Sequence, residues 1–128
     1  MWDDHQVLTH GDATPSNFIF SGNGVTAIDL ERMKYSDRVF DLGRVVGEIQ
    51  HHFVQGTGNK ENAEPFIGHF LWEYSCHFPD RHSAFKAITA RLPFQIAVTL
   101  LRVARNSWIS RDHAHKLIQM AKGTLASV

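Results

Sequence analysis

The spacing of apolar residues changes near residue 37, and this change most constrains what the chain can fold into. Before it, short β-prone runs at residues 6–9, 17–20 and 25–28 alternate with loop-forming residues. After it, apolar residues recur every three or four positions, as on the buried face of a helix. One hairpin and one further strand are too little sheet to be stable alone. We therefore expect an α+β fold, mostly helical, in which the hairpin packs on four or five helices.

Turn and cap residues predict where these elements begin and end. The segment Ser21-Gly22-Asn23-Gly24 lies between two β-prone runs, and its Asn-Gly pair predicts a hairpin. Asp37 or Asp41 is expected to cap or charge the start of the first helix, which the glycines at 56 and 58 end. Pro93 costs about 3 kcal/mol inside a helix, so it predicts a kink or two separate helices. The three later helical runs are expected over residues 62–77, 83–107 and 111–122.

Size and charge restrict the class of protein. A chain of 128 residues is one domain, or one lobe of something larger. Thirteen Lys and Arg balance thirteen Asp and Glu, which argues against a nucleic-acid or membrane-surface partner, and no apolar run predicts a membrane span. The single cysteine, Cys76, excludes an internal disulfide and favours a reducing, cytoplasmic location. Residues 1–64 hold ten of the acids and only five bases, so carboxylate chemistry is expected in the first half.

Three oxygen-bearing side chains have the spacing of a phosphoryl-transfer site. Asp12 and Asn17 are five positions apart across Ala13-Thr14-Pro15-Ser16, which reads as a tight loop. This is the Asp-to-Asn spacing of a kinase catalytic loop, in which the Asp is the base and the Asn holds metal. Asp29 follows the second hairpin strand, and the hairpin returns it towards Asn17. We expect the three side chains to converge on one metal–phosphate site.

The stretch from about residue 7 to residue 47 resembles the aminoglycoside phosphotransferase and choline kinase-like family, which has a protein-kinase-like fold. This stretch is about a third of the chain, and its elements arrive in the family's order and at suitable spacing. The remaining residues resemble the family only as a helical bundle of plausible size. The matching elements are His10-Gly11-Asp12, Asn17, Ile28-Asp29-Leu30-Glu31 and Phe40-Asp41-Leu42-Gly43.

The resemblance implies a role for each matching position. Asp12 would be the catalytic base, and Asn17 and Asp29 would bind Mg²⁺ with ATP or GTP as phosphoryl donor. Glu31 would bind the metal through water or position the substrate, on the expectation that an extended strand points it the same way as Asp29. The structural residues would be His10 and Asp41, which pin the catalytic loop.

The same resemblance divides the chain. Residues 1–36 would hold the catalytic loop and metal-binding hairpin, and residues 37–128 the helical bundle, together a C-terminal lobe. The sequence has no glycine-rich loop before a strand with a lysine, and its first lysine is Lys34. We therefore expect the N-terminal nucleotide-clamping lobe to be absent. The isolated chain should bind Mg·ATP weakly, transfer phosphate slowly, and use its exposed apolar surface to associate with the missing lobe or a second copy.

The sequence leaves alternatives open for both the substrate and the function of the chain. Residues 65–128 hold only three acids among eight bases, which favours a neutral or anionic small-molecule hydroxyl substrate over a polycation. The chain could instead be a non-catalytic remnant lobe that acts as a binding module. A third reading is a metal-dependent hydrolase that uses His10, Asp12 and Asp29 and binds a transition metal tightly. The nine histidines predict no zinc site. Arg102, Arg105 and Arg111 form either a basic patch or a solvated helix face.

Overall fold

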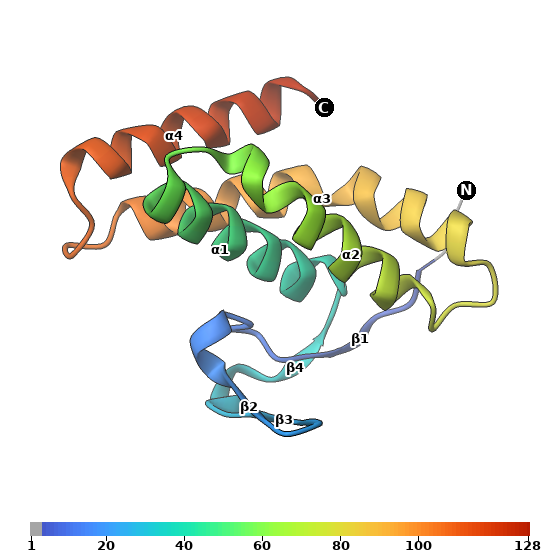
Figure 1. Ribbon diagram of the computed structural model, residues 1–128. Coiled ribbons are helices and arrows are strands. Elements are labelled where there is room, and N and C mark those ends of the chain that lie inside the picture. The colour runs from blue at the N-terminus through green and yellow to red at the C-terminus, as the bar shows by residue number, and fades with distance from the viewer. Residues whose placement is uncertain (1–3) are drawn as a thin grey trace.

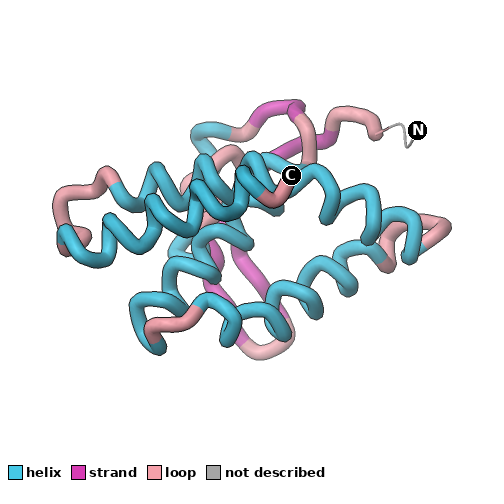
Figure 2. Tube along the Cα trace, turned by 90° about the horizontal axis from the view of Figure 1, so that it is seen from above, coloured by secondary structure: helices cyan, strands magenta, loops and turns pink. Residues whose placement is uncertain are grey.

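A helical layer lies over a small β layer in the computed structural model, which describes residues 4–128 (Figure 1). The view from above shows the helices side by side, with the strands beneath them (Figure 2). The α+β prediction is confirmed.

The β layer consists of two antiparallel pairs in the described residues. The hairpin is formed by β2 (Phe18–Ser21) and β3 (Gly24–Ala27), and its register pairs Ser21 with Gly24. The predicted hairpin is therefore confirmed, with Gly22-Asn23 as its two-residue loop. Gly22 has a φ of 55°, which glycine adopts without steric cost.

The second pair joins distant parts of the chain. β1 (Val7–Thr9) pairs with β4 (Lys34–Ser36), a strand that the sequence did not predict because it is short and polar. The buried Thr9 hydroxyl donates to the carbonyl of Lys34 at 2.8 Å and lies 2.8 Å from the Ser36 hydroxyl. This pair fixes the start of the loop that follows β1.

Four α-helices follow in the described residues, near the predicted positions. Short 3₁₀ turns occupy residues 15–17, 30–32 and 60–63. The Asp37 carboxylate accepts a hydrogen bond from Val39 N–H at the start of the first helix, and Gly58 ends that helix with a φ of 79°. The helices are α1 (Val39–Thr57), α2 (Glu64–Ser75), α3 (Arg81–Ala104) and α4 (Arg111–Ala126).

Pro93 does not divide the third helix. α3 is continuous from Arg81 to Ala104 with Pro93 inside it, so the prediction of two separate helices is wrong. The neighbouring positions Leu92, Ile96 and Ala97 are buried in the core. Packing of these side chains offsets the cost of the missing hydrogen bond, because tertiary burial outweighs local propensity.

The hydrophobic core lies among the helices. α3 packs against α1, α2 and α4, and α1 also contacts α2. Two glycines allow α1 and α3 to approach closely: a Cβ on Gly43 would lie 2.4 Å from Gln95 Cβ, and one on Gly47 would lie 2.7 Å from Thr99 Cβ. The largest fully buried apolar side chains are Val46, Ile88, Leu100 and Leu117.

The hairpin is packed less closely than the sequence predicted. Every residue of β3 and all but the first of β2 are exposed, and the Phe20 side chain is 75% exposed. A cavity of about 710 Å³ lies between this hairpin and helices α1 and α2. The expected close contact with the helices is therefore replaced by an apolar gap.

Among the described residues, α3 is long and apolar enough to cross a membrane by length and composition alone. It is also the helix on which α1, α2 and α4 pack. The core helix of a folded domain meets the same test, so this finding by itself is weak evidence for a membrane span.

Candidate active site

The loop that follows β1 is held by one carboxylate from α1. Asp41 accepts a hydrogen bond from His10 N–H at 2.6 Å and a second from Gly11 N–H at 3.1 Å. Gly11 has a φ of 86°, and a Cβ there would lie 2.3 Å from the carbonyl oxygen of Arg32. Only glycine fits this position, and the loop turns directly into Asp12.

His10 uses both ring nitrogens within the fold. Its Nε2 lies 2.8 Å from the carbonyl oxygen of Ile28, and its Nδ1 accepts from Asp12 N–H at 3.1 Å. The ring is buried and ties the loop after β1 to the end of the hairpin. Neither nitrogen is left for a metal ion, which argues against the hydrolase that needed His10 as a ligand.

Asp12 and Asn17 are joined by direct hydrogen bonds. The Asn17 amide nitrogen donates to the Asp12 carbonyl oxygen at 2.8 Å and to its Oδ2 at 3.3 Å. Asn17 is buried at the end of the 3₁₀ turn Pro15–Asn17, which Pro15 begins. Because the amide nitrogen makes both bonds, the amide oxygen is the atom that a metal ion would take.

Two arginines face the Asp12 carboxylate. Arg44 of α1 donates to Asp12 Oδ1 at 2.9 Å, and Arg102 of α3 lies 3.7 Å from the same oxygen. Sequence reasoning did not single out Arg44. A signal was available: Arg44 follows Asp41 by three positions, and such residues share a helix face.

Asp29 lies one residue from a backbone contact with Asn17. Ile28 N–H donates to the Asn17 carbonyl oxygen at 2.9 Å, which brings the end of β3 beside the loop that carries Asp12 and Asn17. Asp29 is exposed and has φ 62° and ψ 55°, the only positive φ at a non-glycine residue in the described chain. Such a conformation costs about 1 kcal/mol or more and occurs preferentially at functional sites.

Glu31 is placed differently from the expectation. It lies in the 3₁₀ turn Leu30–Arg32 and not in an extended strand, so the argument that it points the same way as Asp29 is wrong. Asp12, Asp29 and Glu31 do not form a group with ligand atoms within 4.8 Å of one another. The backbone bond from Ile28 N–H to the Asn17 carbonyl places Asp29 next in sequence to a residue that contacts Asn17, and both side chains carry oxygen atoms of the kind that a hard cation prefers.

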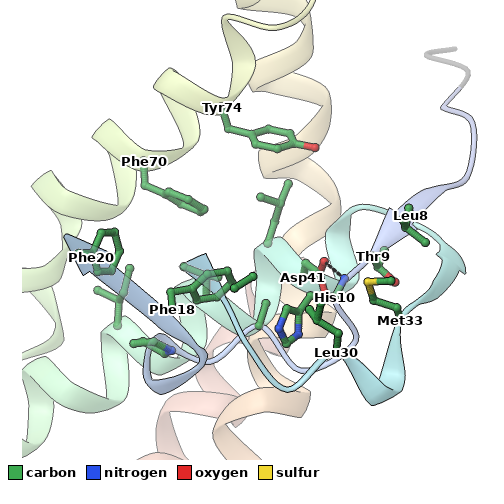
Figure 3. A pocket seen from close by; sticks show the side chains of 16 residues that line it. Leu8, Thr9, His10, Phe18, Phe20, Leu30, Met33, Asp41, Phe70 and Tyr74 are labelled. Carbon is green, nitrogen blue, oxygen red and sulfur yellow. Dashed lines mark hydrogen bonds between the residues drawn. The ribbon is translucent and has the colours of Figure 1, made fainter. Parts of the chain in front are cut away.

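The apolar cavity lies behind the loop and is lined mainly by carbon (Figure 3). His10 and Asp41 reach its edge, whereas Asp12 does not line it. Figure 3 shows Phe18 and Phe20 of the hairpin on one side and Phe70 and Tyr74 of α2 on the other. This cavity separates the two layers and is not the polar face that Asp12 presents.

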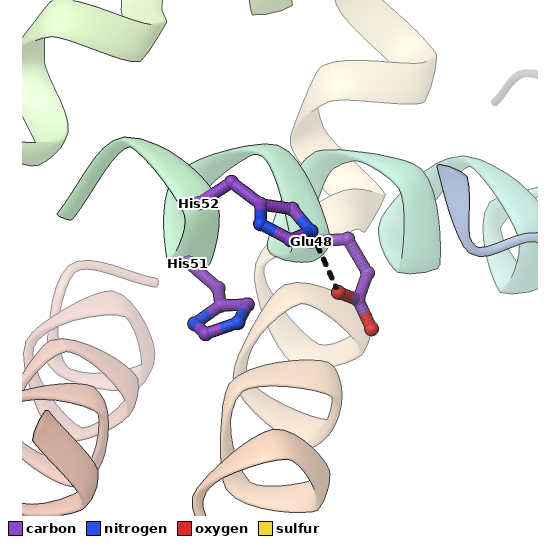
Figure 4. A group of neighbouring side chains, drawn as sticks. All are labelled: Glu48, His51 and His52. Carbon is purple, nitrogen blue, oxygen red and sulfur yellow. Dashed lines mark ion pairs between the residues drawn. The ribbon is translucent and has the colours of Figure 1, made fainter. Parts of the chain in front are cut away.

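A group of possible metal ligands lies on α1, where the sequence predicted none (Figure 4). The ligand atoms of Glu48, His51 and His52 lie within 4.8 Å of one another. His51 Nδ1, however, is 2.8 Å from His113 Nε2, and the buried pair joins α1 to α4. Burial and the neighbouring histidines lower the pKa of His51 from 6.5 to about 4.

A carboxylate and an amide fixed on one loop beside a hairpin, within an α+β fold, define a candidate phosphoryl-transfer site. The comparison with known families agrees: the model of the phosphotransferase enzyme family matches residues 1–75, more than half of the chain. The chain belongs to this family. It matches no curated protein and no solved structure.

Proposed function

We propose that the chain is the C-terminal lobe of a protein-kinase-like phosphotransferase, which transfers the γ-phosphate of ATP or GTP to a hydroxyl group of a small molecule. The observation that carries the proposal is the Asp12–Asn17 pair, hydrogen-bonded side chain to side chain on a loop that Asp41 holds. Family membership supports the same reaction class.

Asp12 has the surroundings that a positioned base needs. Its side chain is 22% exposed, so a substrate can reach it, while Asn17 and Arg44 hold one carboxylate oxygen each. Phosphoryl transfer depends mainly on positioning and charge stabilisation. In this proposal Asp12 orients the attacking hydroxyl and accepts its proton.

Asn17 and Asp29 would hold Mg²⁺ through the amide oxygen and the carboxylate. When bound, the ion neutralises charge on the donor phosphates. The exposed Asp29 carboxylate and the inward-facing amide nitrogen of Asn17 support this assignment. Glu31 is exposed, two positions after Asp29, and would act on the metal through water.

The chain has few of the residues that such enzymes use to bind the nucleotide phosphates. Its sequence contains no glycine-rich loop followed by a strand with a lysine. Clamping of the phosphates contributes several kcal/mol in such enzymes. We therefore propose that efficient turnover needs a further lobe, and that the chain alone transfers phosphate slowly.

The test is transfer of radiolabelled γ-phosphate from Mg·ATP to a panel of small hydroxyl compounds. Asp12→Ala should lower the rate by about a thousandfold or more, because base and positioning act together. Its circular dichroism spectrum should be unchanged. The matched control is Asp112→Ala, which removes an exposed carboxylate on α4. Transfer above background that is equally fast in Asp12→Ala and the unmodified chain would refute the proposal.

The same samples test the non-catalytic alternative. If Mg·ATP binds, Asp29→Ala abolishes that binding, and no hydroxyl compound is phosphorylated, the chain is a nucleotide-binding module. Transfer that depends on Asp12 excludes that alternative.

A further inference from the structure

A second, polar pocket opens on the Asp12 side of the catalytic loop. It has a volume of about 390 Å³ and lies where the loop, α1 and the end of α3 meet. It is separate from the apolar cavity behind the loop, with which it shares only Pro15. The residues that give it its chemical character are Asp12, Arg44, Glu48, Arg102, Arg105 and Trp108.

Positive charge in this pocket exceeds negative charge. Three arginines line it, and arginine stays protonated under all ordinary conditions. The two acids that line the pocket with them are Asp12 and Glu48, and burial raises the pKa of Glu48. Two histidines also line the pocket: His52 Nε2 lies 3.8 Å from Glu48 Oε2, and burial lowers the pKa of His51 to about 4.

The three arginines are not equivalent. Arg44 has a side chain only 13% exposed and donates to Asp12 at 2.9 Å, so it is committed to that carboxylate. Arg102 is 34% exposed and lies 3.7 Å from the same oxygen, too far for a good hydrogen bond. Arg105 is exposed at the pocket wall. Arg102 and Arg105 can therefore bind an incoming anion while Arg44 keeps Asp12 in position.

We propose that this pocket binds the phosphate acceptor, and that the acceptor is a small hydroxyl compound carrying a phosphate or carboxylate group. The inference rests on the proposed function and narrows it. Arg102 and Arg105 would hold the anionic group with the paired N–H donors that suit such oxyanions. The hydroxyl would then lie against Asp12.

Trp108 closes one side of the pocket. It lies in the loop between α3 and α4 and is 77% exposed, whereas the next residue, Ile109, is buried. An exposed indole beside arginines offers a flat apolar surface for the carbon skeleton of a ligand. A polycationic acceptor would instead meet three guanidinium groups, and repulsion between like charges would disfavour its binding.

The test uses three probes that differ only in the end group: glycerol, glycerol 3-phosphate and glycerate, with kanamycin as the polycation. Isothermal titration calorimetry on the unmodified chain should show both anions binding at least about tenfold more tightly than glycerol or kanamycin. The double variant Arg102→Gln/Arg105→Gln should lose this preference. Arg111→Gln, which removes an exposed arginine outside the pocket, should keep it.

Equal affinity for glycerol and glycerol 3-phosphate would overturn the inference, and so would an equal loss in the Arg111→Gln control. The two proposals fail separately. Anion binding that depends on Arg102 and Arg105 without any phosphoryl transfer would leave the pocket standing as an anion site and refute the kinase. Asp12-dependent transfer that is as fast to glycerol as to glycerol 3-phosphate would support the kinase and refute the anion-binding pocket.

Discussion

At the scale of single residues, the loop between β1 and β2 depends on a backbone conformation that only glycine adopts freely. Gly11→Ala should lower the free energy of unfolding by about 2 kcal/mol or more, because the φ of 86° and the contact with the Arg32 carbonyl both oppose a Cβ. Urea unfolding measures this change. Gly22→Ala is the matched control, since Gly22 also has positive φ but has nothing within 4 Å. Equal losses would show that the Arg32 contact contributes nothing.

Much of the candidate site could be predicted from the sequence because its residues are close along the chain. Asp12 and Asn17 share one turn, and their contact follows from local geometry. Arg44 could have been found from its helix face, which it shares with Asp41, but Arg102 could not be predicted from local spacing. Arg102 reaches the Asp12 carboxylate across 90 positions of sequence, and only the packing of α1 on α3 brings it there.

At the scale of elements, the crossing of α1 and α3 depends on small residues. Gly47→Ala should destabilise the protein by about 1–3 kcal/mol, because the new Cβ would lie 2.7 Å from the stiff Cβ of Thr99. Gly56→Ala in the same helix has nothing within 4 Å and should stabilise it by up to about 1 kcal/mol. Thermal unfolding of both variants checks the opposite signs. A stabilising Gly47→Ala would contradict the close approach of the helices.

The junction of α1 with α4 should make stability depend on pH. The pKa of His51 is about 4 in the folded protein against 6.5 for the free side chain, so the unfolded chain takes up the proton first as pH falls. His51 therefore contributes at most about 3 kcal/mol to the free energy of unfolding. This contribution is fully present above about pH 6.5 and is lost as the pH falls towards 4. Burial also lowers the pKa of His113, so both partners act in the same direction.

Urea midpoints at pH 7 and pH 5 measure this effect. The unmodified protein should lose more stability between the two pH values than His51→Gln, in which His113 is the one member of the pair left to titrate. His115→Gln, at an exposed position of α4, is the control and should behave like the unmodified protein. An identical loss in His51→Gln would assign the pH dependence to other groups.

Helix positions could be predicted closely, since the apolar period and the caps are local signals. Asp80 and Ser110 accept hydrogen bonds from the N–H groups of Ser83 and His113 at the starts of α3 and α4. β4 could not be predicted, because Lys34-Tyr35-Ser36 is extended only through its pairing with β1. The continuity of α3 through Pro93 likewise depends on neighbouring helices and not on the residue itself.

At the scale of the whole molecule, the two layers differ in how well they are packed. The core lies wholly within the helical layer and the residues that join it. The hairpin holds its place through the His10–Ile28 and Ile28–Asn17 hydrogen bonds, while its apolar side chains face the cavity or solvent. Exposed apolar side chains gathered on one layer favour association.

We therefore expect the isolated chain to associate with a second copy through the hairpin. Ile19, Phe20 and Val25 are 51%, 75% and 58% exposed, and burying one such side chain contributes about 1.5–3 kcal/mol. Sedimentation equilibrium should show dimers, and Phe20→Ser should weaken them by about tenfold or more. Leu125→Ser, at an exposed position of α4, should leave them unchanged. A monomer at every concentration would contradict this expectation, and an equal effect of both variants would place the contact elsewhere.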